Sequence, residues 1–219
     1  MNRANAVLGI STSGPVEAAI LDGARAFVGA TKEQALASLL GCVERVLRDA
    51  GMSLDRVALI AVCVGPGSFT GLRIGVAFAK SLAQARDIPL VGVSAYDVAQ
   101  AGHEPTHTGV ALVAGKRGFY YARLRAHKNA PFDFVRGDRT AMAEAIRVAA
   151  GTGDAPVTLY GEMPGSVDAP HVVGSSFAQR PPGDRAREVA KLGLQARKAG
   201  ASGDWRTLEI DYGQAPYVP

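Results

Sequence analysis

The feature that most constrains the fold is a buried strand, a glycine-rich turn and a helix in direct succession. Val57–Val64 reads VALIAVCV, and this short uncharged run closed by Gly-Pro-Gly predicts a strand buried on both faces of a sheet. The turn Gly65–Gly71 reads GPGSFTG and carries no charge. Leu72–Arg86 has helical composition, and Ser68 or Thr70 can serve as its N-cap. A helix N-terminus lined with glycine can bind an anion, or it can let another segment of chain pack very close.

Three generic motifs do not fit this turn. A phosphate-binding P-loop requires Lys and then Ser or Thr after the last glycine, but Leu-Arg follows Gly71. A dinucleotide fingerprint requires the third glycine one residue earlier, and an acidic residue where the next strand ends, at Ser94. A nucleophile elbow requires glycine two residues on either side of Ser68, where the chain has proline and threonine. A tight turn that binds no ligand stays open as an alternative.

Extended to GPGSFTGLRIG, the same stretch resembles the signature of the TsaB (YeaZ) family, bacterial partners in making threonylcarbamoyladenosine on tRNA. Weaker resemblance continues through Ile88–Ser94, Phe119–Ala122 and the closing Gln214–Val218. The signature residues are Gly65, Pro66, Gly67, Ser68, Phe69, Thr70, Gly71, Arg73 and Gly75.

Length and composition indicate a compact protein without a membrane span. The 219 residues, 47% of them hydrophobic, can form one domain or two small lobes. No run approaches the ~18 apolar residues of a membrane helix, and the N-terminus lacks a signal-peptide core. Cys42 and Cys63 are expected to be small core residues, a pattern typical of the cytosol. We therefore expect a cytoplasmic protein.

The order of elements in the first half predicts an α/β fold. Strands are expected at 6–10, 16–21, 24–28, 57–64 and 88–93, and helices at 32–50, 72–86 and from 94 onward. Asp22-Gly23 predicts a hairpin turn, and Thr31 is the expected N-cap of the first helix. Three strands followed by helix-strand-helix-strand form the half-unit of the actin-like ATPase (ASKHA) fold of sugar kinases, Hsp70 and actin. The family resemblance implies the same fold.

The second half is expected to be a shortened second lobe. Strands are predicted at 108–114, 119–125, 132–135 and 157–160, with a short one at 171–173, and helices at 139–150 and 184–198. The domains expected are 1–103, an N-terminal actin-like lobe with the signature, and 104–219, a smaller C-terminal lobe. The sequence shows no internal repeat.

Catalytic groups of related folds are missing. Active members carry an Asp in the first hairpin, where this chain has Ser11, and Val113 replaces a second acidic residue that the family often has. Both differences remove anionic oxygen that Mg²⁺ would use. The catalytic relative TsaD carries two metal-binding histidines on its first helix, and residues 32–40 contain none. His103 and His107 flank Pro105, which interrupts a helix, so we expect no metal, no cofactor, no catalytic residue and no protease activity.

The resemblance implies a non-catalytic subunit that dimerises with TsaD. The complex would also recruit the ATPase TsaE, and it would modify the adenosine next to the anticodon of tRNAs reading ANN codons, with tRNA contacted indirectly. Alone, the chain would form a homodimer. A nucleotide or small-molecule binder using the Gly65–Gly71 turn, an independent sugar-kinase-like enzyme and a degenerate paralogue are the alternatives. The expected partner surface comprises Leu36, Leu39, Val43, Gly75, Phe78 and Ala79, for which intramolecular packing stays open.

A basic segment lies in the second half. Residues 116–139 contain Lys116, Arg117, Arg123, Arg125, Lys128, Arg136 and Arg139 against Asp133 and Asp138. Such a segment can meet RNA phosphate or an acidic protein, although its sequence does not interleave aromatic residues, and a solvated face is the simpler interpretation.

Overall fold

The structure, a computed structural model, describes residues 6–101, 108–114, 120–125, 133–150, 157–161, 172–176 and 181–213. The chain forms two compact units. Unit 1 comprises Met1–Ser94 and Arg180–Asp211, and unit 2 comprises Ala95–Gln179 and Tyr212–Pro219. Among the described residues, no helix is long and apolar enough to cross a membrane.

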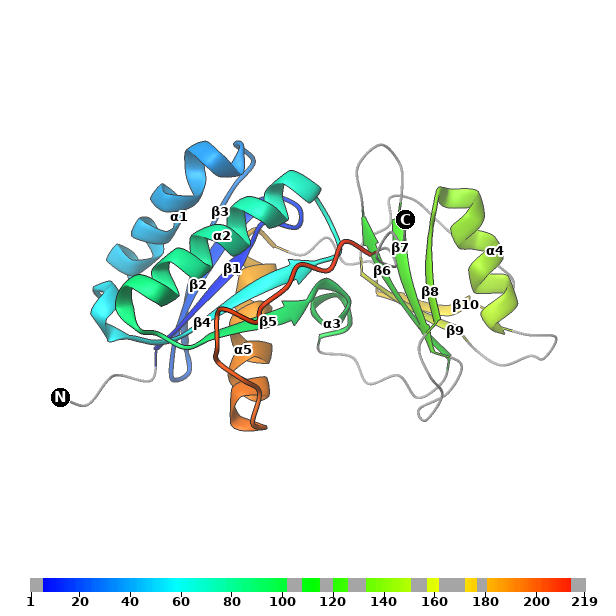
Figure 1. The fold of residues 1–219 in the computed structure, drawn as a ribbon. Coiled ribbons are helices and arrows are strands. Elements are labelled where there is room, and N and C mark those ends of the chain that lie inside the picture. The colour runs from blue at the N-terminus through cyan, green and yellow to red at the C-terminus, as the bar shows by residue number, and fades with distance from the viewer. Residues whose placement is uncertain are drawn as a thin grey trace, which may run out of the picture. The chain divides into compact units, whose positions relative to one another are not determined.

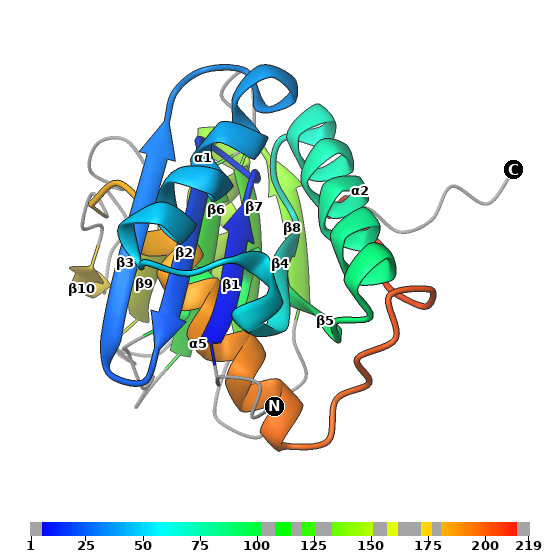
Figure 2. The same ribbon diagram turned by 90° about the vertical axis from the view of Figure 1, so that its left-hand side faces the viewer.

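Unit 1 is a three-layer α/β/α structure (Figures 1 and 2). Its elements are β1 (Ala6–Ser11), β2 (Val16–Asp22), β3 (Arg25–Thr31), α1 (Ala35–Asp49), a 3-10 turn (Leu54–Arg56), β4 (Val57–Gly65), α2 (Phe69–Arg86), β5 (Leu90–Ser94) and α5 (Asp184–Lys198). The sheet order is β3-β2-β1-β4-β5. The first three strands are antiparallel, whereas β4 is parallel to both β1 and β5. Helices α1 and α2 cover one face, and α5 covers the other (Figures 1 and 2).

The two helices on the first face begin differently from each other. Ser68 is the N-cap of α2, and its Oγ accepts a hydrogen bond from the backbone N–H of Gly71 at 3.3 Å, which confirms the predicted cap. The prediction of Thr31 as N-cap of α1 is wrong. That helix begins after Gln34, and Thr31 Oγ1 accepts instead from the backbone N–H of Glu33. Strand β3 continues to Thr31, three residues past its predicted end, and so occupies the position where the helix was expected to begin.

The domain boundary differs from the predicted 103/104 division because α5 returns to unit 1. The helix packs on β1, β2 and β4 through small residues. A Cβ on Gly9 would lie 2.1 Å from the carbonyl oxygen of Ala186, and a Cβ on Gly193 would lie 2.4 Å from the Cβ of Ala61. The second face of the unit 1 sheet is therefore covered by a helix that follows β5 by almost ninety residues of chain.

An extended segment, residues 201–211, lies along β5 and is drawn in red in Figure 1. The backbone N–H of Leu90 donates to the carbonyl oxygen of Gly203 at 2.9 Å, and that of Asp211 donates to Val64 at 2.8 Å. Trp205, Leu208 and Ile210 pack against the core of unit 1. The segment thereby protects an edge strand that would otherwise expose unpaired backbone groups.

Unit 2 repeats the strand order of unit 1. Its elements are α3 (Ala95–Gln100), β6 (Thr108–Ala114), β7 (Tyr120–Arg125), β8 (Asp133–Gly137), α4 (Arg139–Ala150), β9 (Val157–Gly161) and β10 (Val172–Ser176). The sheet order β8-β7-β6-β9-β10 and its strand directions match β3-β2-β1-β4-β5. Unit 1 has helices at both later connections, whereas the described residues of unit 2 contain α4 alone there. The two units thus share a topology that no sequence repeat revealed.

Candidate functional site at the glycine-rich turn

Three segments meet where β1 and β4 end in unit 1. They are the turn between β1 and β2, the glycine-rich turn between β4 and α2, and the first turn of α5. The backbone N–H of Ser68 donates to the carbonyl oxygen of Ser13 at 2.7 Å, which joins the first two segments. Carboxyl ends of parallel strands are where open α/β sheets bind ligands, so this is the first place to look for chemistry.

The signature glycines allow α2 to lie directly on the β1–β2 turn. A Cβ on Gly67 would lie 2.6 Å from the carbonyl oxygen of Ser13. A Cβ on Gly71 would lie 2.2 Å from the carbonyl oxygen of Thr12, and one on Gly75 would lie 2.1 Å from Thr12 Oγ1. Carbon atoms do not approach that closely, so each position requires glycine. Close packing of chain, one of the two interpretations of the glycine-lined turn, therefore accounts for these three residues.

Gly65 serves a second close contact on the other side of the turn. Its φ is 113°, a conformation that favours glycine, and its Cβ would lie 2.1 Å from the carbonyl oxygen of Asp211. The end of the 201–211 segment thus passes directly over the start of the signature.

Other signature residues point outward. Phe69 is 56% exposed, and Thr70 and Arg73 are exposed as well. The Arg73 guanidinium lies 5.5 Å from the centre of the Phe69 ring, within the range of a cation–π contact. Packing within unit 1 explains the glycines but does not explain why these larger side chains stand on the surface.

The β1–β2 turn offers hydroxyl groups and no carboxylate. Ser11, Thr12 and Ser13 are all buried, and the Oγ atoms of the two serines lie 3.2 Å apart. Among the described residues, Thr12 Oγ1 has no hydrogen-bond partner. These hydroxyls can hydrogen-bond, but they lack the negative charge that a divalent cation prefers.

The thiol nearest this turn is held in its protonated form. Burial raises the pKa of Cys63, and hydrogen bonds from Gly65, Ser13 and Ser11 and the charge of Arg185 oppose that rise without cancelling it. Burial likewise raises the pKa of Cys42, again against an opposing contribution from Arg45. Because the thiolate is the nucleophile, neither cysteine is prepared for covalent chemistry.

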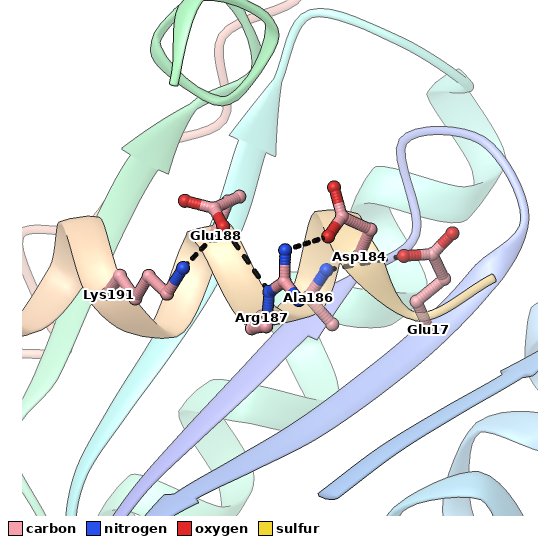
Figure 3. A network of polar contacts seen from close by, with 6 residues as sticks. All are labelled: Glu17, Asp184, Ala186, Arg187, Glu188 and Lys191. Carbon is pink, nitrogen blue, oxygen red and sulfur yellow. Dashed lines mark hydrogen bonds and ion pairs between the residues drawn. The ribbon is translucent and has the colours of Figure 1, made fainter. Parts of the chain in front are cut away.

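Glu17 is the buried carboxylate close to the turn, and it is committed to structure. It is 2% exposed, and its Oε1 accepts from Arg185 Nη1 at 2.9 Å. Its Oε2 accepts from the backbone N–H of Ala186 at 3.3 Å (Figure 3). A carboxylate at the N-terminus of α5 also compensates the helix dipole. Sequence reasoning missed this pair, although a carboxylate within the otherwise apolar run VEAAIL was a signal for it.

The network continues along α5. Arg187 forms ion pairs with Asp184 and, at 3.4 Å, with Glu188, and Lys191 contacts Glu188 at 2.8 Å (Figure 3). Within the ranges that the structure describes, no group of three or more His, Cys, Asp or Glu residues could hold a metal. The described turn can therefore pack and hydrogen-bond, but it presents no acid, base or nucleophile to a substrate.

The residues predicted for the partner surface separate into two groups. Leu39, Val43, Gly75 and Ala79 are buried in unit 1, so a partner cannot contact them in this conformation. Leu36 is 82% exposed and Phe78 is half-buried. Exposed Leu40, one helical turn after Leu36, was not among the predicted residues.

The remaining predicted positions lie in or near unit 2. Val113 is half-buried and packs against Tyr96, Ala99 and Tyr121, so no acidic group stands there. His103 and His107, as well as Lys116, Arg117 and Lys128 of the basic segment, lie outside the described residues.

Comparison with known proteins agrees with this architecture. The family model described as TsaD, tRNA N6-adenosine threonylcarbamoyltransferase, matches residues 30–152, more than half of the chain. The TsaB tRNA threonylcarbamoyladenosine biosynthesis protein of Bacillus subtilis (strain 168) is 35% identical over 101 residues, 46% of this chain and 44% of that protein. The tRNA N6-adenosine threonylcarbamoyltransferase of Streptococcus sanguinis (strain SK36) is 47% identical over 53 residues, 24% of this chain and 16% of that protein. The match thus spans less than half the length of these relatives.

A solved structure extends the similarity over the whole fold. YeaZ from Pseudomonas aeruginosa superposes with a TM-score of 0.70 at 21% identity, covering 95% of this chain and 99% of that chain. Two units with the same strand order, the second with fewer described helices, define the actin-like ATPase (ASKHA) class, as the sequence predicted. The chain belongs to the TsaD family, and within it to the TsaB (YeaZ) proteins.

Proposed function

We propose that this protein is a non-catalytic subunit in the synthesis of threonylcarbamoyladenosine on tRNA, and that it acts by dimerising with a TsaD-type catalytic subunit. The observation that carries the proposal is its similarity to proteins named TsaB, together with a signature turn that presents no catalytic group. A TsaE-type ATPase joins the complex in this proposal, and tRNA is contacted indirectly.

The chemistry of the β1–β2 turn supports a non-catalytic role. Ser11 and Thr12 lack the negative charge with which a carboxylate binds magnesium, and the nearby Glu17 carboxylate is occupied by Arg185 and by the backbone of α5. Nucleotide binding at the glycine turn is not part of the proposal, because Gly67, Gly71 and Gly75 are in contact with the protein's own Thr12 and Ser13.

The partner surface that we propose is the outer face of α1 with the adjoining part of α2. Leu36 and Leu40 are 82% and 57% exposed, and they lie four residues apart and therefore on one stripe of α1. Phe78 of the neighbouring α2 is half-buried. Contiguous exposed apolar patches, unlike single exposed residues, mark interaction surfaces, and a TsaD-type subunit is the occupant that the family relationship supplies. In the absence of that subunit the same stripe pairs two copies of this chain.

Co-purification with the TsaD-type subunit of the same organism tests the proposal, with threonylcarbamoyladenosine in tRNA as the second readout. The wild-type chain should retain the subunit, and Leu36→Glu should lose it without loss of its own folding. Gln195→Glu, which introduces the same carboxylate at an exposed position of α5 on the opposite face of the sheet, is the matched control and should retain binding. A chain that retains no TsaD-type subunit and restores no modified tRNA contradicts the proposal.

Self-association is measured separately by light scattering. The wild-type chain alone should be a dimer at high concentration, and Leu36→Glu should be a monomer. A wild-type monomer that still binds the TsaD-type subunit would contradict the predicted homodimer but not the proposed pairing with the TsaD-type subunit.

A further inference from the structure

The two edges of the unit 1 sheet differ from each other. Strand β5 at one edge is covered by the 201–211 segment, whereas β3 at the other edge has no strand beside it among the described residues (Figure 2). Edge strands of stable proteins are usually short, charged, or interrupted by proline or a bulge. Strand β3 is seven residues long and pairs with β2 in one unbroken register. Its residues 26–31 read AFVGAT, without charge or proline, so nothing in their sequence blocks the addition of another strand.

Alternate residues of β3 direct their backbone groups away from β2. The two strands are joined by a two-residue turn, and the residues on either side of such a turn form a hydrogen-bonded pair. Hydrogen-bonded and non-hydrogen-bonded pairs then alternate, so the backbone groups of Ala26, Val28 and Ala30 point to the open side. The carbonyl of Ala30 agrees with this direction, because it accepts from Arg45 Nη2 at 3.1 Å. In the part of the chain that the structure describes, both groups of Ala26 and Val28 and the N–H of Ala30 have no hydrogen-bond partner.

Packing on both faces holds β3 in its extended conformation. On the α5 side, a Cβ on Gly183 would lie 2.6 Å from the Cβ of Val28. On the α1 side, a Cβ on Gly29 would lie 2.9 Å from Val46 Cγ1. Val28 is nevertheless 44% exposed, and Ala26 is exposed as well. The edge is therefore ordered before a partner arrives, which lowers the conformational entropy lost on binding.

A guanidinium group lies beside this edge without a carboxylate partner. Arg45 is exposed, and it hydrogen-bonds to the edge of β3 from α1. Glu44 and Asp49, the carboxylates nearest to it along α1, form no ion pair with it in the described ranges. At the other end of the strand, Arg25 is paired with Asp22. A carboxylate on an added strand would therefore complete an ion pair at Arg45 that the described chain leaves unmade.

We propose that β3 binds an extended peptide segment of another protein, and that this segment carries a carboxylate side chain. The segment adds a strand to the unit 1 sheet through the backbone groups of Ala26, Val28 and Ala30, and its carboxylate pairs with Arg45. In this mode of recognition the main-chain hydrogen bonds supply affinity, and side chains at alternate positions supply specificity.

A second copy of this chain fits the edge less well, because its own uncharged residues 26–31 bring no carboxylate to Arg45. The edge is also a different surface from the stripe of Leu36 and Leu40, since Arg45 lies about 140° around α1 from Leu40. The inference therefore goes beyond the proposed pairing with a TsaD-type subunit and does not depend on it.

Fluorescence anisotropy with the full chain and a labelled synthetic peptide tests the proposal. The probe alternates valine and threonine over about eight residues, with one central glutamate and soluble glycine-serine flanks, and a second probe has lysine in place of the glutamate. The wild-type chain should bind the lysine probe at least about two-fold more weakly, as expected for one exposed ion pair. N-methylation of alternate peptide residues should abolish binding when the methyl groups face β3, and should preserve it in the other set.

Substitutions at the edge separate the backbone from the side chains. Val28→Pro removes an outward N–H without removing a bond to β2, and should weaken binding of the glutamate probe by at least about five-fold. Val28→Thr keeps the backbone groups and should bind like wild type. Arg45→Gln should make the two probes bind alike. Arg206→Gln, which removes an exposed arginine beyond the opposite edge of the sheet, is the matched control and should still distinguish them.

Hydrogen exchange of the Ala26 and Val28 amides identifies the occupant of the edge. Exchange should be rapid in the chain alone and slow with the glutamate probe bound. Slow exchange that develops with the concentration of the chain alone would place a second copy on the edge, and slow exchange at every concentration would place a segment of the same chain there. Either result overturns the proposal. It is also overturned if neither probe binds, if both N-methylated sets bind alike, or if Arg45→Gln still distinguishes glutamate from lysine.

Discussion

At the scale of single residues, the signature contains two kinds of position. Gly67, Gly71 and Gly75 are glycine because backbone or side-chain atoms of the β1–β2 turn occupy the space of a Cβ. Phe69 and Arg73 are exposed, so packing of the fold does not account for these side chains. A family signature of this type therefore contains both positions required for packing and positions on the surface. Substitution should lower the stability of the fold at the first kind and leave it largely unchanged at the second.

Gly71→Ala tests the packing requirement, with Gly41→Ala as its matched control. A Cβ on Gly71 would meet a backbone oxygen, so we expect the free energy of unfolding to fall by ~1–3 kcal/mol. Gly41 lies within α1 with no atom within 4 Å of its Cβ position, so alanine there should raise stability by ~0.5–1 kcal/mol. Urea unfolding followed by the fluorescence of Trp205, the single tryptophan of the chain, reports on unit 1.

The contact of Gly75 with Thr12 allows a second check of the same packing. Gly75→Ala should be destabilising, and Thr12→Ala should recover much of the loss because it removes the Oγ1 atom 2.1 Å from the new Cβ. Additive effects of the two substitutions, or a neutral Gly71→Ala, would show that α2 does not lie on the turn as described.

Both thiols should be protected in the folded protein. A free cysteine is about half ionised near pH 8.5, whereas burial raises the pKa of Cys63 and of Cys42, so less thiolate is present at that pH. We expect a disulfide reagent at pH 8.5 to label the native chain far more slowly than free cysteine, and to label both thiols in urea. Cys63→Ala should leave one reactive thiol in urea, and rapid labelling of native Cys63 would contradict the assignment.

At the scale of secondary-structure elements, burial distinguishes the faces of α2. Ala79 is fully buried in the core and Ala77 is exposed two residues earlier on the same helix. Gly75 and Ala79, whose small size favours close contact between helices, are thus buried in the interior of unit 1.

Ala79→Trp should therefore destabilise unit 1, with a loss of at least about 2 kcal/mol from overpacking. Ala77→Trp, the same substitution at an exposed position of the same helix, should leave the midpoint of thermal unfolding close to that of wild type. If Ala79→Trp kept its midpoint but lost the TsaD-type subunit in a pull-down, the stripe of Gly75 and Ala79 would be a partner surface and not core.

At the scale of the whole molecule, unit 1 is discontinuous in sequence. The hairpin carrying Glu17 and the helix carrying Arg185 are separated by all of unit 2, yet they share a buried ion pair. Removing one member of such a pair leaves an uncompensated charge in the interior, so we expect folding of unit 1 to require α5.

A chain that joins residues 6–94 to 181–211 through a flexible linker of about a dozen Gly and Ser residues should unfold cooperatively in urea. Residues 6–94 alone should not, because one face of their sheet, including Gly9 and Ala61, loses the helix that covers it. Cooperative unfolding of 6–94 alone would show that α5 is dispensable to unit 1.

Local pattern was sufficient for the elements and for the fold class. Residues 108–114, 139–150 and 184–198 form the predicted strand and helices, because periodicity and helix signals act over a few neighbouring residues. GPGSFTGLRIG was sufficient for the family, which the comparisons confirm. The proposed role as a subunit stays a prediction, and so does the partner surface.

Tertiary structure alone decided which neighbours each element has. No pattern within α5 states that it packs on β1 and not on unit 2, since that choice depends on small residues such as Gly9 and Gly193 at positions far apart in the chain. The buried face of α2 was equally ambiguous, because alanine and glycine suit a core and an interface alike. The sequence by itself thus determined the elements, the topology class and the family of this protein. Long-range packing, which depends on contacts between distant residues, decided which side chains remain on its surface.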